Sequence, residues 1–336
     1  MDDGVLVEVT RGSRVESQHR GVAAVVDAEG AVVFQVGDID APVFPRSAVK
    51  AIQALPLLET GAADRFGLTD AEIALACASH SGEAAHAAAA AAMLHKAGRD
   101  GSCLECGAHW PIGADAAHVL AAAGECPSAL HNNCSGKHSG FVCVACATGA
   151  DIEGYIHPDH PVMREVTEAL AGVTGATLDE ANRATDGCSI PTYAVPLRSL
   201  ALGFARFGSG HGLGSARAAA ARRIRAAVAA HPFMVAGTGR FDTELMVALG
   251  TRAFVKTGAE GVHCGALPEL GFGFALKCDD GAGRAAEVVT AALVRHFLRP
   301  QDEPASTLDR LARPRLHNWN GIIVGELRPA GAVQAL

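Results

Sequence analysis

The sequence predicts an α/β (α+β) fold, in which both ends of the chain contribute to one antiparallel sheet flanked by helices, with a helical insertion. Strand-like runs lie near both termini, and helical signals fill the middle. We therefore expect a sheet portion at about residues 1–45 plus 250–336 and a helical portion at about 46–249. Together they would form a single unit over residues 1–336.

The strands are predicted from runs rich in β-branched residues. Near the N-terminus these runs cover 5–9, 22–26 and 31–36, and near the C-terminus 252–256, 261–265, 273–277 and 322–325. Asp27-Ala28-Glu29-Gly30 separates the second run from the third and is typical of a hairpin turn.

The helices are predicted from their start signals and apolar spacing. Pro45-Arg46-Ser47 is expected to open a helix, because the fixed φ of proline suits a first turn. Thr69 to Glu72 and Thr177 to Glu180 both resemble capping boxes. Further helices are expected at 84–96, 215–230, 242–249 and 288–298.

Composition narrows the class of protein. Hydrophobic residues make up 49% and charged residues 19%, which is typical of a globular chain. The formal net charge of −8 argues against a nucleic-acid partner. The acidic start, Met1 to Gly4, shows no signal peptide, and the longest apolar run, 87–94, is too short to cross a membrane. Ten cysteines without an export signal indicate reduced thiols, so we expect a cytoplasmic protein.

Ser47-Ala48-Val49-Lys50 is a Ser-x-x-Lys motif. On a helix, residues i and i+3 share a face, so the lysine amine can reach the serine hydroxyl. A serine needs such a base to become a nucleophile. The amine can accept the proton only when neutral, a form that burial or a second nearby cation favours. The alternative is a helix-opening serine beside an ordinary lysine.

Lys256-Thr257-Gly258, at the end of an expected strand, supplies a second lysine. Ser-x-x-Lys with Lys-Thr-Gly is the signature of serine β-lactamases and penicillin-binding proteins. The serine-rich turn Cys77-Ala78-Ser79-His80-Ser81 could stand where those enzymes keep a third element, although it lacks the form of that element.

Cys134-Ser135-Gly136-Lys137-His138 and Asp186-Gly187-Cys188 form a second constellation. Thiolates and imidazoles bind zinc, so the residue types alone nominate Cys134, His138 and Cys188. The alternative is a turn with buried free cysteines.

Taken together, the motifs resemble the rhizobial-type (class 3) L-asparaginases of the asparaginase II family. The resemblance is carried by segments 45–50, 79–83, 131–138, 186–188, 237–242 and 256–261. It implies a β-lactamase/penicillin-binding-protein-like fold, shared with serine-dependent glutaminases. It also implies hydrolysis of L-asparagine to L-aspartate and ammonia.

The resemblance assigns roles to individual residues. It pairs Ser47 with Lys50 and Ser79 with Lys256 as catalytic residues. We expect Ser47 to attack, Lys50 to take its proton, and Ser79 to relay a proton toward the leaving ammonia. Backbone N–H groups near Ser47 and Gly258 would hold the oxyanion.

Substrate and metal contacts are expected as well. Asp186 could pair with the substrate ammonium and Arg240 with its carboxylate, while His80 and Gly258 are further candidate contacts. The resemblance replaces His138 by Lys137, making Cys134, Lys137 and Cys188 the Zn²⁺ ligands, with pH-dependent binding because a lysine ligand must be deprotonated. It also implies a homodimer.

Three other functions remain open at this stage. A glutaminase would accept a substrate one methylene longer, which a pocket distinguishes by only about 1–3 kcal/mol. A β-lactam or peptide hydrolase could use the same groups. A zinc-binding or thiol-redox module would need neither serine.

Overall fold

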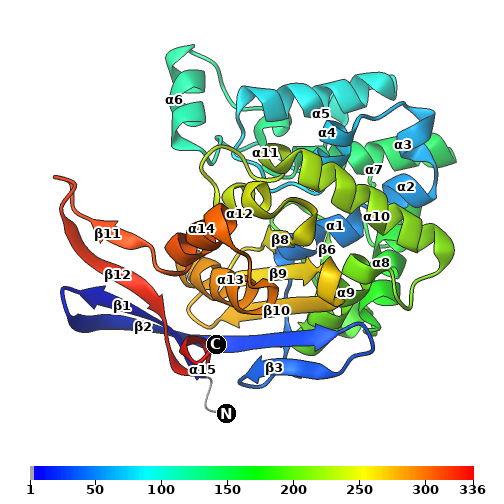
Figure 1. The fold of residues 1–336 in the computed structure, drawn as a ribbon. Helices are drawn as coiled ribbons and strands as arrows, with labels where there is room; N and C mark the ends of the chain where they lie inside the picture. Colours follow the sequence, from blue (N-terminus) through cyan, green and yellow to red (C-terminus); the bar gives the residue numbers. More distant parts are fainter. Residues whose placement is uncertain (1–3) are drawn as a thin grey trace. The chain divides into compact units, whose positions relative to one another are not determined.

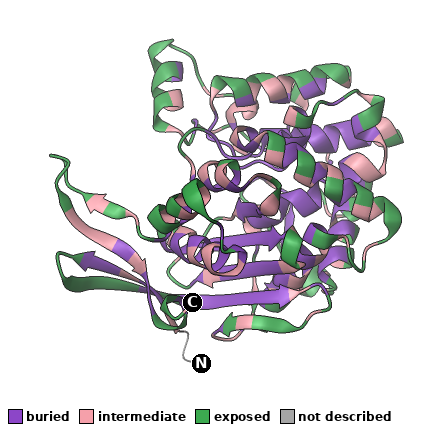
Figure 2. Cartoon of the chain, viewed as in Figure 1, coloured by how far each residue is buried: buried purple, intermediate pink, exposed green. Residues whose placement is uncertain are grey.

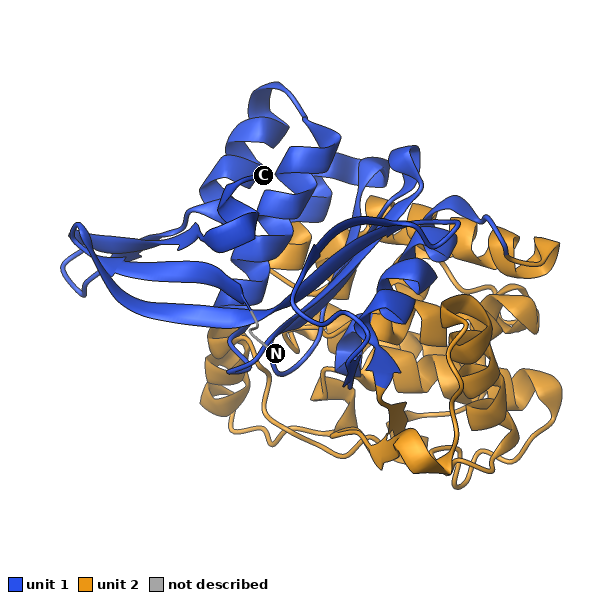
Figure 3. Ribbon diagram, turned by 90° about the horizontal axis from the view of Figure 1, so that it is seen from below, with its two compact units in different colours: residues 1–48, 195–212, 245–336 blue, residues 49–194, 213–244 orange. Residues whose placement is uncertain are grey.

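A computed structural model describes residues 4–336, so the acidic start at residues 1–3 lies outside the described part. The contacts of the chain divide it into two compact units. Unit 1 contains residues 1–48, 195–212 and 245–336, and unit 2 contains 49–194 and 213–244 (Figure 3). Helix α12 (Phe241–Leu249) runs across the division. Unit 1 therefore includes residues 195–212, which lie inside the range expected to be helical.

Unit 1 is built on an antiparallel sheet that joins both ends of the chain. Its strands follow the order β11-β12-β1-β2-β10-β9-β8, with β3 also paired to β2. Their bounds are β1 (Gly4–Arg11), β2 (Arg14–Asp27), β3 (Val32–Val36), β8 (Phe254–Thr257), β9 (Val262–Leu267), β10 (Phe272–Cys278), β11 (Arg315–His317) and β12 (Ile323–Pro329). Strands β4 (Pro42–Val43) and β7 (Val195–Pro196) form a separate pair. The predicted antiparallel sheet from both termini is confirmed.

Helices cover both faces of this sheet. Successive residues of a strand point to opposite faces, and on β10 they meet different helices. A Cβ at Gly273 would lie 2.1 Å from the Ala201 carbonyl oxygen, so α9 (Leu197–Ser209) lies directly on that face. The Phe272 ring instead packs against Phe297 of α13 (Gly283–Leu298), with centroids 5.7 Å apart. Unit 1 also contains α14 (Asp302–Ala312) and α15 (Gly331–Gln334).

Burial in the sheet follows this coverage. Residues 21–26 of β2 and most of β10 are buried, whereas residues 14–18 of β2 are exposed (Figure 2). The predicted hairpin turn is confirmed, because Asp27 and Gly30 close it with backbone hydrogen bonds and Gly30 takes a φ of 95°.

Unit 2 is mainly helical (Figure 1). Its helices are α1 (Lys50–Gln53), α2 (Leu55–Glu59), α3 (Ala62–Arg65), α4 (Asp70–Ala76), α5 (Ala84–Lys96), α6 (Ala114–Ala122), α7 (Ser135–Thr148), α8 (Pro161–Thr174), α10 (Ser215–Ala230) and α11 (Pro232–Val235). Strands β5 (Arg183–Thr185) and β6 (Pro191–Tyr193) pair with each other. Among residues 4–336, no helix has both the length and the apolar character needed to cross a membrane.

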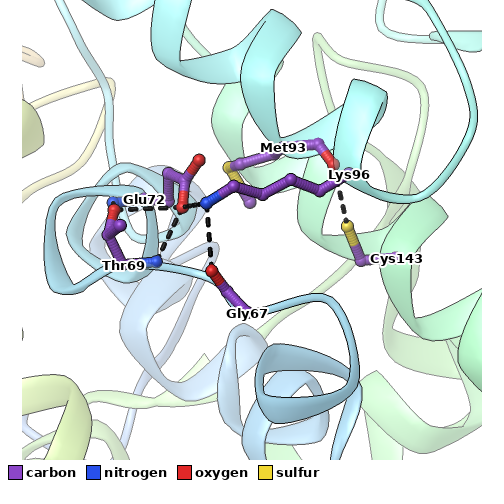
Figure 4. A network of polar contacts seen from close by, with 6 residues as sticks. All are labelled: Gly67, Thr69, Glu72, Met93, Lys96 and Cys143. Atoms are coloured by element: carbon purple, nitrogen blue, oxygen red, sulfur yellow. Dashed lines mark hydrogen bonds and ion pairs between the residues drawn. The ribbon is translucent and has the colours of Figure 1, made fainter.

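The capping box expected at Thr69 is confirmed and belongs to a larger network (Figure 4). Glu72 Oε2 accepts the Thr69 N–H at 2.7 Å and also pairs with Lys96 Nζ at 2.6 Å. Lys96 Nζ donates to the Gly67 carbonyl as well. This network ties the start of α4 to the end of α5, so Lys96 has a structural role.

The second expected capping box is wrong. Residues 180–182 form only a short 3-10 turn, which is capped by Asp179 rather than Thr177. The chain then enters β5, whose pairing with β6 replaces helical hydrogen bonds. At Pro45 the expected helix begins as a 3-10 turn, Arg46–Val49, before α1.

Close packing of α7 on α4 positions the second constellation. A Cβ at Gly136 would lie 2.4 Å from both the Leu75 carbonyl oxygen and its Cγ, so only glycine fits there. The same contact brings the start of α7, with Cys134 and Lys137, beside the end of α4. The chain continues from α4 directly to Ser79.

Candidate active site

In unit 1, the turn that carries Ser47 packs against the Lys-Thr-Gly segment. The Ala48 N–H donates to the Pro45 carbonyl at 3.0 Å and closes the turn. A Cβ at Gly258 would lie 2.7 Å from that same carbonyl oxygen and 3.3 Å from Ala48 Cβ. Two motifs about 200 residues apart in the sequence are therefore neighbours, and glycine permits the close approach.

Lys256 is fully buried at the end of β8. Its Nζ donates to the Thr257 carbonyl at 2.8 Å. The Gly258 N–H donates to the Val262 carbonyl at 2.7 Å, within the β8–β9 hairpin. An oxyanion bound by Gly258, as the sequence predicted, would have to share or displace that hydrogen bond.

In unit 2, Lys50 is fully buried and its amine is held by three oxygens. Nζ donates to the Ala78 carbonyl at 2.6 Å, to Ser79 Oγ at 3.0 Å and to the Asn133 carbonyl at 3.4 Å. The contact between Lys50 and Ser79 was not among the expected pairs. It joins a lysine of one predicted pair to the serine of the other.

The segment after α4 that carries Ser79 is fixed by backbone hydrogen bonds. The Ser79 N–H donates to the Val235 carbonyl at 2.9 Å, and the Ser81 N–H to the Ala236 carbonyl at 2.8 Å. Glu83 continues the contact by accepting the Thr238 N–H at 2.8 Å. Ser79 is 6% exposed, so it is nearly enclosed yet remains at the edge of solvent.

The predicted metal ligands Cys134, Lys137 and Cys188 lie together in unit 2. Lys137 Nζ donates to Cys188 Sγ at 2.9 Å, and the two cysteines share a hydrogen bond. That bond, with help from the charges of Lys50 and Lys137, holds the pKa of Cys134 well below its usual value. The same bond, together with burial, raises the pKa of Cys188. Cys134 Sγ also donates to Asn133 Oδ1 at 3.0 Å.

Lys137 keeps its proton in this arrangement. Its burial acts to lower the pKa, but Cys188, Cys134 and Asp186 outweigh that effect and raise it. Asp186 also accepts the Cys188 thiol at 3.3 Å. The ammonium of Lys137 is therefore stabilised by the two cysteines and by the Asp186 carboxylate.

His138 points to a different partner. Its Nδ1 lies 2.7 Å from the Tyr155 hydroxyl, and burial lowers its pKa well below the usual value. Among residues 4–336, no group of three or more His, Cys, Asp and Glu side chains is arranged to hold a metal ion. The set of Cys134, His138 and Cys188 nominated by residue types alone is thus not assembled.

Arg240 lies on the loop before α12, in unit 2. Its Nη1 is buried and has no hydrogen-bond partner within residues 4–336. A buried guanidinium nitrogen without an acceptor fits the predicted role of binding a substrate carboxylate.

One cavity of unit 2, about 710 Å³ in volume, lies beside α6. Its lining includes Ser81, Glu83 and Thr238 but none of the predicted catalytic or metal-binding residues. The convergence of polar side chains, rather than this cavity, therefore identifies the candidate site.

Several groups of the site had no signal in the sequence. The Ala78 and Asn133 carbonyls are backbone groups, which any residue provides. Asn132 shapes the turn by accepting the Cys134 N–H at 2.8 Å, and Ser135 contacts His80. Both side chains lie inside the motif at 131–138, which is the only hint the sequence gives.

Comparisons with known proteins place this arrangement in a family. A search of curated proteins finds no match. Among solved structures, one described as Mglu is 13% identical, with a TM-score of 0.38, and the match covers 83% of this chain and 67% of that one. A β-lactamase from Mycobacterium bovis is 14% identical, with a TM-score of 0.37, and the match covers 79% of this chain and 89% of that one. At these TM-scores neither likeness supports a conclusion.

The family comparison covers nearly the whole chain. A family model described as L-asparaginase II matches residues 7–329, a range that includes every predicted site residue. The chain therefore belongs to the L-asparaginase II family.

Proposed function

We propose that this chain, an amidohydrolase by its family, hydrolyses L-asparagine to L-aspartate and ammonia by serine–lysine catalysis. The observation that carries the proposal is the 3.0 Å contact between Lys50 Nζ and Ser79 Oγ inside a buried polar cluster. A buried amine touching a serine hydroxyl is the arrangement that proton transfer between the two requires.

The surroundings of Lys50 direct its amine at Ser79. The carbonyls of Ala78 and Asn133 can only accept, so they use two N–H bonds of the amine. The remaining position faces Ser79 Oγ. A neutral amine would accept the serine proton through its lone pair there, and the resulting ammonium would donate the proton back.

The proposed sequence of steps conserves every proton. A serine Oγ attacks the side-chain amide carbon while a lysine takes the hydroxyl proton. That proton passes to the amide nitrogen as the C–N bond breaks and ammonia leaves. Water then attacks the acyl-enzyme ester, releases aspartate and restores the serine.

Which serine attacks is a separate question. The sequence assigns attack to Ser47 with Lys50 as its base, and a proton relay to Ser79 with Lys256. The Lys50–Ser79 contact suits that relay, and it suits attack by Ser79 equally. Mass spectrometry after rapid mixing of substrate with Ser47→Ala and with Ser79→Ala separates these roles, because only the variant that keeps the nucleophile can form an acyl-enzyme.

Recognition of an α-amino acid is assigned to two charged side chains. Arg240, with its unpartnered buried Nη1, would bind the carboxylate. Asp186, beside the Cys134 cluster, would bind the ammonium. The decisive test measures ammonia released from asparagine and from glutamine, with Ser79→Ala as the control. Release from glutamine alone would make the chain a glutaminase, and release from neither would refute the proposal.

Zinc is proposed as a bound ion held by Cys134, Lys137 and Cys188. Two sulfurs and an amine already contact one another in a buried cluster, and the Lys137 ammonium would release its proton on binding the ion. Zinc would supply a positive charge able to polarise a bound oxygen. Isothermal titration with Zn²⁺ tests this proposal, and Cys188→Ser should weaken binding. Zinc binding without any amidase activity would instead favour the zinc-binding module.

A homodimer in the cytoplasm completes the proposal. All ten cysteines lie in the described range and none forms a disulfide, which suits a reducing compartment. Sedimentation at two protein concentrations tests the dimer.

A further inference from the structure

The turn at Asn132–Ser135 lies between two groups of the site. The Asn133 carbonyl accepts from Lys50 Nζ at 3.4 Å and from the His80 N–H at 3.3 Å. The next residue, Cys134, belongs to the cluster with Lys137 and Cys188. A shift of this turn would therefore move an acceptor of Lys50.

The His80 side chain is hydrogen-bonded on both ring nitrogens and is fully buried. Its Nδ1 accepts the Gly82 N–H at 3.1 Å, and its Nε2 lies 2.9 Å from Ser135 Oγ. A backbone N–H can only donate, so Nδ1 carries no proton in the neutral ring. The proton therefore resides on Nε2 and is donated to Ser135 Oγ.

The plane of the ring is fixed as well. His86 stacks on His80 with centroids 4.8 Å apart and an interplanar angle of 10°, and Phe233 stacks on the other face of His86. Burial, with the nearby His86 and Lys50, lowers the pKa of His80 well below its usual value, so the ring stays neutral at neutral pH.

We propose that His80 is a positioning residue whose Nε2–H···Oγ bond to Ser135 holds the Asn132–Ser135 turn against the Ser79 segment and keeps Lys50 Nζ on Ser79 Oγ. The inference rests on the proposed serine–lysine hydrolysis. It differs from the expected contact between His80 and substrate, because the ring is enclosed and both nitrogens are occupied.

Backbone hydrogen bonds fix one side of the site more firmly than the other. Ser79 and Ser81 are hydrogen-bonded to the Val235 and Ala236 carbonyls, so this side of the site is anchored. On the other side, the His80 N–H and ring both reach the turn. The ring contact, at 2.9 Å, is shorter than the hydrogen bonds that the Asn133 carbonyl accepts from the His80 N–H at 3.3 Å and from Lys50 Nζ at 3.4 Å.

The test uses variants that separate the two ring nitrogens. In His80→Gln, the side-chain amide can place an N–H near the former Nε2, whereas in His80→Asn it reaches only the Nδ1 position. Ser135→Ala removes the acceptor. Ser139→Ala is the matched control, since it makes the same change one turn later on α7, where the buried Oγ donates to the Ala90 carbonyl.

We expect Ser135→Ala and His80→Asn to lower kcat for asparagine about 10- to 100-fold, the scale of a small misplacement of catalytic groups. KM should change little, because the substrate is not contacted. His80→Gln should recover most of the loss, and Ser139→Ala should match the wild type. The double variant His80→Asn/Ser135→Ala should be no slower than either single variant.

Two kinetic outcomes would overturn the proposal. One is wild-type kcat in Ser135→Ala, and the other is an equal loss in Ser139→Ala. If His80→Asn and His80→Gln mainly raised KM while Ser135→Ala had no effect, His80 would be a substrate contact instead of a positioning residue.

A readout without substrate distinguishes this proposal from the proposed function. If the wild-type protein releases no ammonia from asparagine or glutamine, the proposed function alone fails. A crystal structure of Ser135→Ala then decides the matter. A Lys50 Nζ–Ser79 Oγ distance beyond about 3.5 Å supports the positioning role, and a distance unchanged from 3.0 Å refutes it.

Discussion

Replacing Lys50 by Met would remove the amine at the centre of the site while leaving a side chain of similar length. The side chain is fully buried, and Nζ has three oxygen partners at 2.6, 3.0 and 3.4 Å. Loss of a general base lowers kcat by about 10²- to 10⁴-fold. That loss corresponds to about 3–5 kcal/mol in activation free energy.

The effect of the same change on stability is smaller. The Ala78 carbonyl loses a close partner, which costs about 1–3 kcal/mol, and the Asn133 carbonyl keeps its bond from the His80 N–H. Removing a buried amine also removes the cost of its desolvation, which acts in the opposite direction. We therefore expect the free energy of unfolding to change by less than about 2 kcal/mol, so the folded variant can be assayed.

Lys96→Met is the matched control. Lys96 Nζ lies 2.6 Å from Glu72 Oε2, and its loss leaves a nearly buried carboxylate with only the Thr69 hydrogen bonds. Since Lys96 is partly exposed, we expect a loss of about 1–2 kcal/mol in stability and an unchanged kcat. Initial rates of ammonia release and urea unfolding curves measure the two quantities for both variants.

The two lysine variants should therefore separate chemistry from folding. Wild-type kcat in a folded Lys50→Met protein would refute the catalytic role of this amine. Equal loss of kcat in Lys96→Met would show that removing a hydrogen-bonded lysine elsewhere has the same effect, and the reasoning from the geometry around Lys50 would fail.

Three further predictions concern other parts of the chain. Arg240→Met should lower kcat/KM about 10- to 100-fold, because hydrogen bonds to a charged group contribute about 1.5–3 kcal/mol; steady-state kinetics at fixed pH measures it, and an unchanged value would exclude carboxylate binding. Gly273→Ala should lower the thermal unfolding midpoint sharply, since its Cβ would lie 2.1 Å from the Ala201 carbonyl oxygen, and an unchanged midpoint would contradict the packing of α9. Burial lowers the pKa of His80 in the folded protein, so the unfolded chain binds the extra proton below about pH 6.5. The free energy of unfolding should consequently fall by up to about 1.4 kcal/mol per pH unit below that point. In His80→Gln, the free energy of unfolding measured with urea should depend less steeply on pH.

The sequence by itself located the main strands of the sheet and several of the helices. Runs rich in β-branched residues identified the strands near both termini, and the helices at 84–96 and 215–230 have the bounds expected for them. These signals are local, since each depends on residues a few positions apart. The error at Thr177 arose where a pairing between β5 and β6, invisible to a local pattern, replaced the helix.

The sequence predicted only part of the candidate site. The Ser-x-x-Lys motif nominated Lys50 and the residue types nominated Cys134, whereas the family resemblance supplied Lys137 and the catalytic role of Ser79. Which lysine touches which serine depends on distances between segments far apart in the sequence. The chain order paired Lys50 with Ser47, and the folded chain places Lys50 Nζ on Ser79 as well as on two carbonyls.

Tertiary structure decided the remaining features for a physical reason. Backbone carbonyls are identical at every residue, so the acceptors at Ala78 and Asn133 have no sequence signature. The tautomer of His80 is likewise set by a backbone N–H at Gly82 and a hydroxyl at Ser135, which the packing of α7 on α4 brings to it. Residue types thus determined which chemistry the chain can support, and long-range packing determined which atoms meet to perform it.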